Sequence, residues 1–500
     1  MRRAAFSRIL SRRTQNGSGS EFLSYIVGAF WAGMNALASV LLPFALFVFF
    51  AREIRPATLG LVAFAMACTE VCKAIGLPGI YEALLQQKDD IRRCHETAIA
   101  LLLCASSILM PVCLLVLYGL GFLVHGLHER FLVLGVLVLR IPLDLATVQP
   151  QAMLVGRLDF RRLAIRTVVA NCLAGSIGVL IATVAEPVAG LVAYQLGQSL
   201  ITFAGTSLGA GLLARPRLHA DCIGRLRRET LLSTGNRTLA ATINYLDQMV
   251  VGPVAGELGL AYYNLGKRLE TMFVTVANSF SAILFQPLFA ANSTLSKQKG
   301  TIRALLVLAV VCGIPSAVVF SNSKMVVGLI FGRNWIGAAP IVGWLSLNGF
   351  VRAVGMVPGS FLSVSGRNRE LLVTSVASAA GSLALVAALA SSNLVACAIG
   401  LVVKNAAIVG WMAWLCRHEV PHPGSIYATT SVLPVAVMIA AASTVTSLLP
   451  PGFAPGRFHE LSSLVCSGLG ASCCGGAWIG IAYLLSVRST ARRPAMELRA

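Results

Sequence analysis

The stretch YYNLGKRLETMFVTVANSF, residues 262–280, carries three charged residues inside an otherwise apolar run. Similar apolar runs recur along the whole chain. Each is long enough to cross the about 30 Å of hydrocarbon in a bilayer as an α-helix. Charged residues make up 12% of the 500 residues, against about 25% in soluble domains. The sequence therefore predicts an all-α integral membrane protein.

Fourteen membrane-spanning helices are predicted from these runs, and the loops between them are too short for a sizeable water-soluble domain. Lys and Arg residues concentrate in the amino-terminal tail and in every second loop, which predicts that both termini are cytoplasmic. The tail lacks a convincing cleavage site, so we expect the first helix to be retained. The predicted spans are 24–50, 57–80, 96–118, 130–154, 163–185, 188–213, 232–254, 260–288, 302–321, 337–363, 371–390, 393–416, 427–449 and 461–487.

The net charge of +20 comes from basic residues that are dispersed through short loops. In a membrane protein this pattern sets orientation, so we expect no nucleic-acid partner. The thirteen cysteines do not have the spacing of a metal site, and we interpret them as small buried apolar side chains. No metal or organic cofactor is expected.

A faint internal repeat predicts two lobes. Residues 126–160 resemble residues 337–370, since each stretch has a glycine, an arginine within the span, a proline and then Gly-Arg at the inner end. The offset equals six spans, an even number, so the two copies share one orientation. The predicted organisation is a cytoplasmic basic tail at 1–23, an amino-terminal six-helix lobe at 24–213, a cytoplasmic basic linker at 214–231, a carboxyl-terminal six-helix lobe at 232–416, an extra helix pair at 427–487 and a cytoplasmic tail at 488–500.

Charged residues inside the predicted spans point to a function, because a charge at the bilayer centre costs about 2.5–3.5 kcal/mol on insertion scales. Such residues usually face the interior of a helix bundle or a wet cavity. Here the cations outnumber the acids. The cations are Lys73, Arg140, Arg237, Lys267, Arg268, Arg352 and Lys404, and the acids are Glu70, Asp144, Asp247 and Glu270.

Two pairs of these residues are spaced for contact within one helix. Glu70 and Lys73 are three residues apart, and Arg140 and Asp144 are four apart, so the members of each pair lie on the same helix face. Structural ion pairs are therefore an alternative to a functional role for these four residues.

The predicted seventh and eighth spans each carry a polar stripe. In the seventh, Arg237 and Asp247 fall within about 80° of each other around the helix. In the eighth, Lys267 and Glu270 share a sector, whereas Arg268 points away from Glu270. Such a stripe must face water or another polar stripe. For Arg268, snorkelling of the long side chain toward the outer surface is an alternative.

We therefore expect a water-filled, net-cationic cavity between the two lobes that binds an anionic cargo. A proton or sodium gradient and the membrane potential both remain open as the source of energy. The substrate-binding candidates are Lys267, Arg237, Arg140, Arg352, Lys73 and Arg268, and the candidates for coupling to H⁺ or Na⁺ are Asp247, Glu70 and Glu270.

Four stretches carry a resemblance to a known family. They resemble, in the family's order, segments of the polysaccharide-transport flippases, the O-antigen and exopolysaccharide branch of the multidrug/oligosaccharidyl-lipid/polysaccharide exporter superfamily. The stretches are FAREIRPATLGLVAFAMACTEVCKAIGLPGIYEALLQQKD (50–89), PQAMLVGRLDFRRLAIRTVVANCLAGSIGVLIA (150–182), LDQMVVGPVAGELGLAYYNLGKRLE (246–270) and FGRNWIGAAPIVGWLSLNGFVRAVGMVPGSFLSVSGRNRE (331–370).

The resemblance implies a bacterial inner-membrane flippase that moves an undecaprenyl-diphosphate-linked oligosaccharide to the outer leaflet by alternating access. It implies no catalytic residue. Tyr262, Asn264, Lys267 and Arg268 match a family segment, whereas Glu270 departs from it. The implied partners are the lipid-linked oligosaccharide, membrane lipids, a polysaccharide polymerase, and chain-length and export proteins.

Two other classes of protein are alternatives to a flippase. A cation-coupled multidrug exporter of the same superfamily should have an acidic, aromatic-rich pocket, whereas cations exceed acids here. A membrane glycosyltransferase, ligase or polymerase needs a large outer loop or a carboxylate and histidine constellation, and the predicted outer loops are short. We expect a transporter and not an enzyme.

Overall fold

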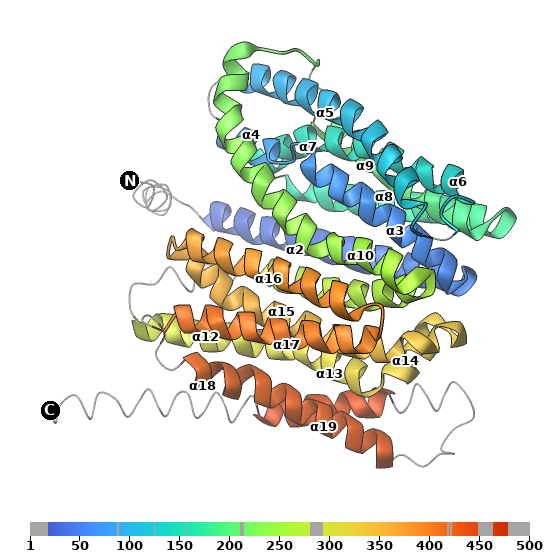
Figure 1. Ribbon diagram of the computed structural model, residues 1–500. Coiled ribbons are helices and arrows are strands. Elements are labelled where there is room, and N and C mark those ends of the chain that lie inside the picture. Colours follow the sequence, from blue (N-terminus) through green and yellow to red (C-terminus); the bar gives the residue numbers. More distant parts are fainter. Residues whose placement is uncertain are drawn as a thin grey trace, which may run out of the picture.

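Helices make up most of the described part of the chain, and many of them run nearly side by side (Figure 1). The structure is a computed structural model that describes residues 19–87, 90–124, 126–157, 159–210, 215–280, 294–417, 420, 423–448 and 464–478. No β-strand occurs within these ranges. The prediction of an all-α protein is confirmed.

The amino-terminal helices follow the predicted apolar runs closely. Most of the predicted basic tail and residues 211–214 lie outside the described residues. The helices of this half are α2 (Gly19–Glu53), α3 (Pro56–Ile75), α4 (Ile80–Gln86), α5 (Ile91–Leu120), α6 (Phe131–Gly135), the short η1 (Val136–Leu139), α7 (Arg140–Gly156), α8 (Phe160–Val184) and α9 (Pro187–Ala210).

The long element α10 (Ala220–Phe280) is two helices joined at Gly256. This glycine has φ 73° and ψ 178°, a conformation that side chains with a Cβ rarely adopt. Across the break the Tyr263 hydroxyl lies 2.8 Å from Asp247 Oδ2, although residues sixteen apart in one straight helix are about 24 Å apart. The chain therefore folds back at Gly256, between the predicted spans 232–254 and 260–288.

Most carboxyl-terminal helices again lie on the predicted runs, whereas Ser323–Phe331 and most of Arg333–Ala338 are helical within the predicted loop between the spans 302–321 and 337–363. Residues 464–478 form a further helix. The other elements are α12 (Thr294–Leu308), the π-helical η3 (Ala309–Gly313), α13 (Ile314–Ser321), α14 (Ser323–Phe331), η4 (Arg333–Ala338), α15 (Ala339–Val364), α16 (Asn368–Leu389), α17 (Leu394–Leu415), α18 (Pro423–Tyr427), the π-helical η5 (Ala428–Val432) and α19 (Leu433–Leu448).

Ten helical segments among the described residues are long and apolar enough to cross a membrane, so the chain is a multi-pass membrane protein. The predicted spans 188–213, 232–254 and 260–288 fall on α9 and α10, outside this set, and 461–487 is described only in part. The number fourteen, the domain boundaries and the orientation stay predictions. The ten segments are Gly33–Glu53, Pro56–Gln86, Ile91–Leu120, Phe131–Gly156, Phe160–Val184, Ser296–Ser321, Arg333–Val364, Asn368–Leu389, Leu394–Leu415 and Pro423–Ser447.

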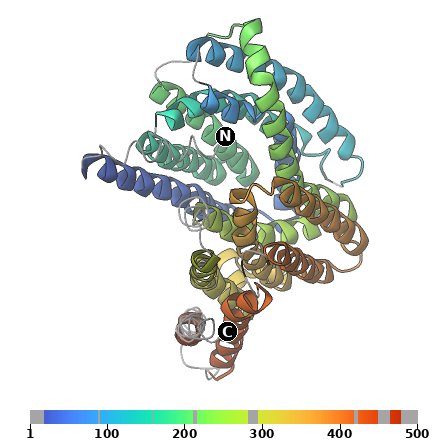
Figure 2. The ribbon, with the colours of Figure 1, turned by 90° about the vertical axis from the view of Figure 1, so that its left-hand side faces the viewer.

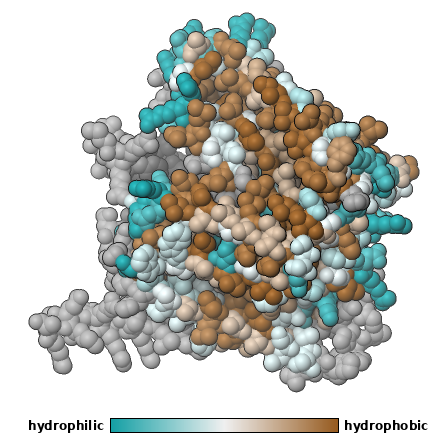
Figure 3. All heavy atoms as spheres, in the orientation of Figure 1, coloured by the Kyte–Doolittle hydropathy of each residue, from teal (hydrophilic) through white to brown (hydrophobic). Residues whose placement is uncertain are grey.

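The surface of the molecule is suited to lipid. Apolar residues cover much of the face seen in Figure 3. Large apolar side chains such as Leu132, Leu208 and Val184 are 86%, 81% and 79% exposed. A soluble monomer rarely exposes apolar surface on this scale, whereas hydrocarbon solvates it and the helices satisfy their own backbone groups.

The two halves of the molecule meet along α2 and α10. Helices α5 to α9 gather at one end of the molecule and α12 to α19 at the other, in both views (Figures 1 and 2). At the predicted outer end, the Trp335 indole donates a hydrogen bond to the Ala51 carbonyl (2.7 Å), and Arg52 Nε donates one to the Ile330 carbonyl (2.7 Å). The Phe331 ring packs edge-on against Phe47, with centroids 6.1 Å apart. These contacts close the outer end between the halves.

Polar contacts attach the last helices to the rest of the bundle. Thr446 Oγ1 donates a hydrogen bond to Asn322 Oδ1 (2.8 Å), and Asn322 Nδ2 donates one to Ser467 Oγ (3.2 Å). Because lipid tails are as apolar as leucine, packing and polar contacts of this kind take over from the hydrophobic effect in holding membrane helices together.

Candidate functional site

Four charged side chains of α3 and α7 form a cluster, here named the amino-terminal quartet: Glu70, Lys73, Arg140 and Asp144. Lys73 Nζ lies 2.6 Å from Glu70 Oε1 and 2.7 Å from Asp144 Oδ2. Arg140 Nη2 lies 3.8 Å from Glu70 Oε1 and 3.7 Å from Asp144 Oδ2. Two cations face two carboxylates, so the cluster is neutral. The pairs that spacing suggested are both present and are joined across the two helices.

A second cluster of four, the carboxyl-terminal quartet, joins the two arms of α10 to α15: Asp247, Lys267, Glu270 and Arg352. Lys267 Nζ lies 2.8 Å from Asp247 Oδ2 and 3.2 Å from Glu270 Oε1. The guanidinium of Arg352 pairs with the same Glu270 oxygen. Both acids are buried. This cluster is neutral as well.

Neutral side chains complete the carboxyl-terminal quartet. The Tyr263 hydroxyl donates a hydrogen bond to Asp247 Oδ2 (2.8 Å), and Asn348 Nδ2 donates one to Glu270 Oε2 (3.0 Å). Arg352 Nη2 donates one to Asn244 Oδ1 (3.0 Å). Buried ion pairs are tolerated only when their remaining hydrogen-bonding positions are also satisfied, and these contacts provide that.

Close approach of α15 and α10 depends on Gly349, the residue after Asn348. A Cβ at Gly349 would lie 2.9 Å from Glu270 Cα and 3.1 Å from the Glu270 carbonyl oxygen. Both are backbone atoms, which have little freedom to move in a packed interior. The glycine therefore lets the backbone carrying Asn348 and Arg352 reach Glu270.

The two quartets occupy corresponding places in the predicted repeat. Arg140 and Arg352 are the arginines within the two similar stretches of sequence. Arg140 reaches Glu70, and Arg352 reaches Glu270. Each half of the molecule thus carries an arginine that contacts a glutamate from a neighbouring helix.

A cavity of about 310 Å³ lies between α2 and α3 on one side and α10 on the other. It therefore combines residues of both halves. The residues that line it are Ser39, Val40, Pro43, Phe44, Ala63, Met66, Ala67, Glu70, Tyr245, Gln248, Asn264, Lys267, Arg268, Thr271, Met272 and Thr275.

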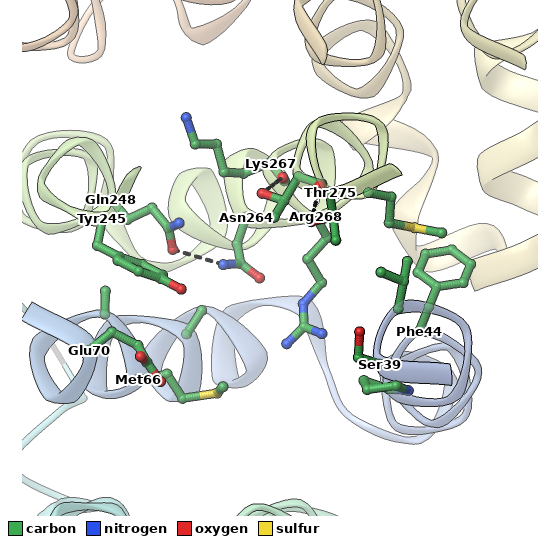
Figure 4. Close-up of a pocket in the computed structure, with 16 residues that line it drawn as sticks. Ser39, Phe44, Met66, Glu70, Tyr245, Gln248, Asn264, Lys267, Arg268 and Thr275 are labelled. Carbon is green, nitrogen blue, oxygen red and sulfur yellow. Dashed lines mark hydrogen bonds between the residues drawn. The ribbon is translucent and has the colours of Figure 1, made fainter. Parts of the chain in front are cut away.

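Arg268 is the cation that extends into this cavity. Its guanidinium points toward α2 and α3, whereas the Lys267 ammonium lies on the far side of α10 (Figure 4). Arg268 Cζ lies 3.7 Å from the centre of the Phe47 ring, a distance suited to a cation–π contact. In the described part of the chain no carboxylate lies within 4.0 Å of this guanidinium.

The other groups around Arg268 can bind a polar ligand. Asn264 Nδ2 donates a hydrogen bond to Gln248 Oε1 (2.9 Å), and Tyr245 lies on the same wall (Figure 4). The charge of Glu70, also in the wall, is compensated by its own quartet. The cavity therefore presents one guanidinium with five N–H donors, together with amides and hydroxyls, to an anionic or sugar-like ligand.

Arg237 lies apart from both the cavity and the quartets. Its Nη2 lies 2.6 Å from Glu82 Oε1, and its Cζ lies 5.3 Å from the centre of the Tyr81 ring. The Arg237 side chain is 46% exposed. It therefore forms a surface ion pair with α4.

The structure thus separates the residues that the sequence singled out. Their predicted roles in substrate binding and ion coupling stay predictions. Sequence reasoning did not single out Tyr245 and Gln248 in the cavity, and it named Asn264 only as a match to a family segment. Their spacing held a signal, because Asn264 and Arg268 are one helical turn apart, as are Tyr245 and Gln248. Arg268 lies in the cavity alone, Glu70 and Lys267 lie in the cavity wall and in a quartet, and Arg237 lies in neither. The remaining members of the quartets are Lys73, Arg140, Asp144, Asp247, Glu270 and Arg352.

A metal centre finds no support in the described residues, where no group of three or more His, Cys, Asp or Glu side chains is placed to hold a metal ion. The described cysteines carry free thiols, and several are buried as expected, including Cys68, Cys312 and Cys397.

Comparison with known proteins gives matches in sequence and in fold. The family described as "Polysaccharide biosynthesis protein" matches residues 49–340. The succinoglycan biosynthesis transport protein ExoT of Rhizobium meliloti (strain 1021) is 24% identical over 332 residues, 64% of this chain and 65% of that protein. The teichuronic acid biosynthesis protein TuaB of Bacillus subtilis (strain 168) is 27% identical over 124 residues, 24% of this chain and 26% of that protein.

Two solved structures show the fold. The lipid II flippase MurJ in an inward closed conformation superposes with a TM-score of 0.68 at 11% identity, over 91% of this chain and 98% of its own. An inward-facing multidrug resistance transporter of the MATE family, in the MOP superfamily, superposes with a TM-score of 0.62 at 14% identity, over 81% of this chain and 100% of its own.

ExoT and the two proteins of known structure are transport proteins by name and not enzymes. Because the family match covers more than half of the chain, the chain belongs to the polysaccharide biosynthesis protein family, and its helices have the fold of the MurJ and MATE transporters.

Proposed function

We propose that the chain is a flippase of the bacterial inner membrane. It moves an oligosaccharide, linked through a diphosphate to undecaprenyl, from the inner to the outer leaflet for surface polysaccharide synthesis. The observation that carries the proposal is Arg268, a guanidinium in a cavity between the two halves with no carboxylate in reach among the described residues. Family membership and the name of ExoT as a transport protein support it, as does the fold of MurJ.

In this proposal Arg268 binds the diphosphate. A guanidinium binds phosphate oxygens through two parallel charge-assisted hydrogen bonds. The cavity amides of Asn264 and Gln248 then face the first sugars. The two neutral quartets add no net charge that would hold the anion too tightly for release.

Transport by alternating access requires the closed outer end to open. The contacts of Trp335 with Ala51 and of Arg52 with Ile330 are the ones that must break. The head group enters from the inner leaflet while the polyprenyl tail stays in lipid. The role implies a polysaccharide polymerase and chain-length and export proteins as partners on the outer side.

The membrane potential can drive this movement. Moving one charge across 100 mV is worth about 2.3 kcal/mol, and a potential that is negative inside favours outward movement of a diphosphate. The predicted coupling residues Asp247, Glu70 and Glu270 already hold cations of the chain. A coupling proton or sodium ion must compete with those cations. We therefore propose that the membrane potential drives transport by acting on the charge of the cargo itself.

A multidrug exporter is the second candidate, and the likeness to the MATE fold favours it. A site for cationic drugs draws on acids and aromatic faces. In this cavity Arg268 already occupies the face of Phe47, and it repels a cation. We therefore expect an anionic cargo.

The test measures flipping in proteoliposomes with a fluorescent undecaprenyl-diphosphate trisaccharide and a membrane-impermeant quencher. Wild-type protein is expected to flip the lipid, and Arg268→Gln to slow it at least about tenfold, the effect of one charge-assisted hydrogen bond. Arg237→Gln is the matched control, since that arginine is outside the cavity, and it should keep the wild-type rate.

Two outcomes contradict the proposal. Wild-type protein that leaves the lipid unmoved but exports a cationic dye identifies a drug exporter. An unchanged flipping rate in Arg268→Gln would show that Arg268 does not bind the diphosphate, which contradicts the proposal.

A further inference from the structure

A second cavity, of about 390 Å³, lies among the carboxyl-terminal helices α15, α16 and α17. Sites for small molecules typically have volumes of about 300–1,000 Å³. Its wall is rich in hydroxyl and amide groups, which are the partners that sugar hydroxyls require. The polar residues of its wall include Ser363, Thr374, Ser375, Ser378, Arg352 and Asn405.

Lys404, on α17, contacts Ser378, a residue that lines this cavity. Its Nζ donates hydrogen bonds to Ser382 Oγ (2.7 Å), to the Ser378 carbonyl (3.1 Å) and to Ser378 Oγ (3.1 Å). All of these acceptors are neutral, and among the described residues no carboxylate lies within 4.0 Å of this ammonium. Because Ser378 also lines the cavity, the ammonium is one side chain away from a ligand there.

The carboxyl-terminal quartet and Lys404, taken together, therefore carry a net positive charge. The carboxyl-terminal quartet is neutral, and Lys404 adds one positive charge to it. An unpaired charge within a membrane bundle is costly, and such residues usually mark a site that binds an ion or substrate. In the described part of the chain, Lys404 has only neutral hydrogen-bond acceptors and no carboxylate to pair with.

The quartet also separates this cavity from the cavity of Arg268. Lys267 lines the first cavity and Arg352 lines the second, and both contact Glu270. A ligand long enough to occupy both cavities would place one anionic group at Arg268 and another at Lys404.

We infer that the second cavity is a subsite for a carboxylated sugar in the glycan of the cargo, an inference that rests on the proposed flippase function. The sugar carboxylate replaces Ser378 as the partner of Lys404, and the ring hydroxyls bond to Ser363, Thr374 and Ser375. A carboxylate fits better than a phosphate. One compact ammonium matches one negative charge, and Arg352 is already paired with Glu270.

The experiment uses two undecaprenyl-diphosphate tetrasaccharides that differ only in one sugar, glucuronate or glucose. Both are flipped by wild-type, Lys404→Met, Lys404→Arg and Lys324→Met proteins in proteoliposomes. Lys324 is exposed on α14 and is the matched control. Lys404→Met is expected to slow the glucuronate lipid about tenfold, the effect of one charge-assisted hydrogen bond. The glucose lipid should keep its rate, and Lys404→Arg should keep both.

Equal slowing of both lipids in Lys404→Met, or of neither, overturns the subsite while leaving the flippase function in place. Wild-type protein that flips neither lipid overturns both proposals. A second measurement needs no variant: equilibrium binding of the two free tetrasaccharides to wild-type protein in detergent. Tighter binding of the glucuronate form supports the subsite, and equal binding overturns it.

Discussion

Lys267 and Arg268 are neighbours on one helix and both line the cavity between the halves, yet their charged groups lie in different surroundings. Successive residues of an α-helix point about 100° apart. Lys267 turns into the carboxyl-terminal quartet, where it contacts two carboxylates. Arg268 turns into the cavity between the halves, where it contacts the Phe47 ring and no carboxylate among the described residues.

The difference shows how to rank charges inside a membrane bundle. A buried cation whose charge is matched by carboxylates of its own chain stabilises the fold. A cation at the same depth without such a match is available to a ligand. We expect variants of the quartets to change stability and variants of the cavity to change transport.

The largest effect is expected for Lys267→Met. The variant leaves Asp247 without a cation and Glu270 with only Arg352. Removing one partner of a buried ion pair costs about 3–5 kcal/mol. Chemical unfolding of the protein in detergent, followed by tryptophan fluorescence, measures the loss.

Arg268→Gln, on the same helix turn, is the matched control for the stability of Lys267→Met. Its free energy of unfolding should stay within about 1 kcal/mol of wild type, since it removes no ion pair. Equal stability of the two variants, combined with lost transport in Lys267→Met, would instead make Lys267 a direct ligand of the cargo.

A smaller effect is expected for Gly349→Val, which tests the packing behind the carboxyl-terminal quartet. The new side chain meets the backbone of Glu270 and pushes α15 away from α10. Overpacking of this kind costs about 1–3 kcal/mol. The same unfolding assay applies, with Gly410→Val on the open side of α17 as control, because a Cβ there meets no atom within 4 Å. Unfolding that matches wild type would show that the contact is not tight.

Glu70→Gln tests a residue of both regions, since Glu70 lies in the amino-terminal quartet and in the cavity wall. Its main effect is expected at the cavity, because Lys73 and Arg140 keep Asp144 as a partner. It removes the carboxylate from the cavity wall, so the field around Arg268 becomes more positive. Inorganic diphosphate should bind about fivefold more tightly, roughly 1 kcal/mol, and the gain should shrink at high salt. Titration calorimetry at two salt concentrations measures it. Weaker binding would mean that Glu70 itself contacts the ligand.

The smallest effect is expected for Arg237→Gln. The residue forms an exposed ion pair with Glu82, and such pairs are worth about 0–1 kcal/mol. Stability and flipping rate should both stay close to wild type. A marked loss of transport with normal stability would show that Arg237 contacts the substrate, as the sequence suggested.

The sequence alone determined the class of the molecule and the position of its helices. Each apolar run is long enough to cross a bilayer as a helix. In lipid such a run must be helical, because its backbone N–H and C=O groups can form hydrogen bonds only within the protein. The polar stripe of residues 262–280 and the angle between Lys267 and Arg268 also follow from helical periodicity.

Only the tertiary structure decided which partner each charge has. Periodicity gives directions around one helix axis but does not say which other helix lies in that direction. Arg352 reaches Glu270 from 82 residues away, and Arg237 meets Glu82 from 155 residues away. Such contacts depend on how helices pack, which rests on small residues such as Gly349 and the reversal at Gly256. For this reason the sequence singled out the cationic residues only as a set, while the fold separated Arg268 from the paired charges around it.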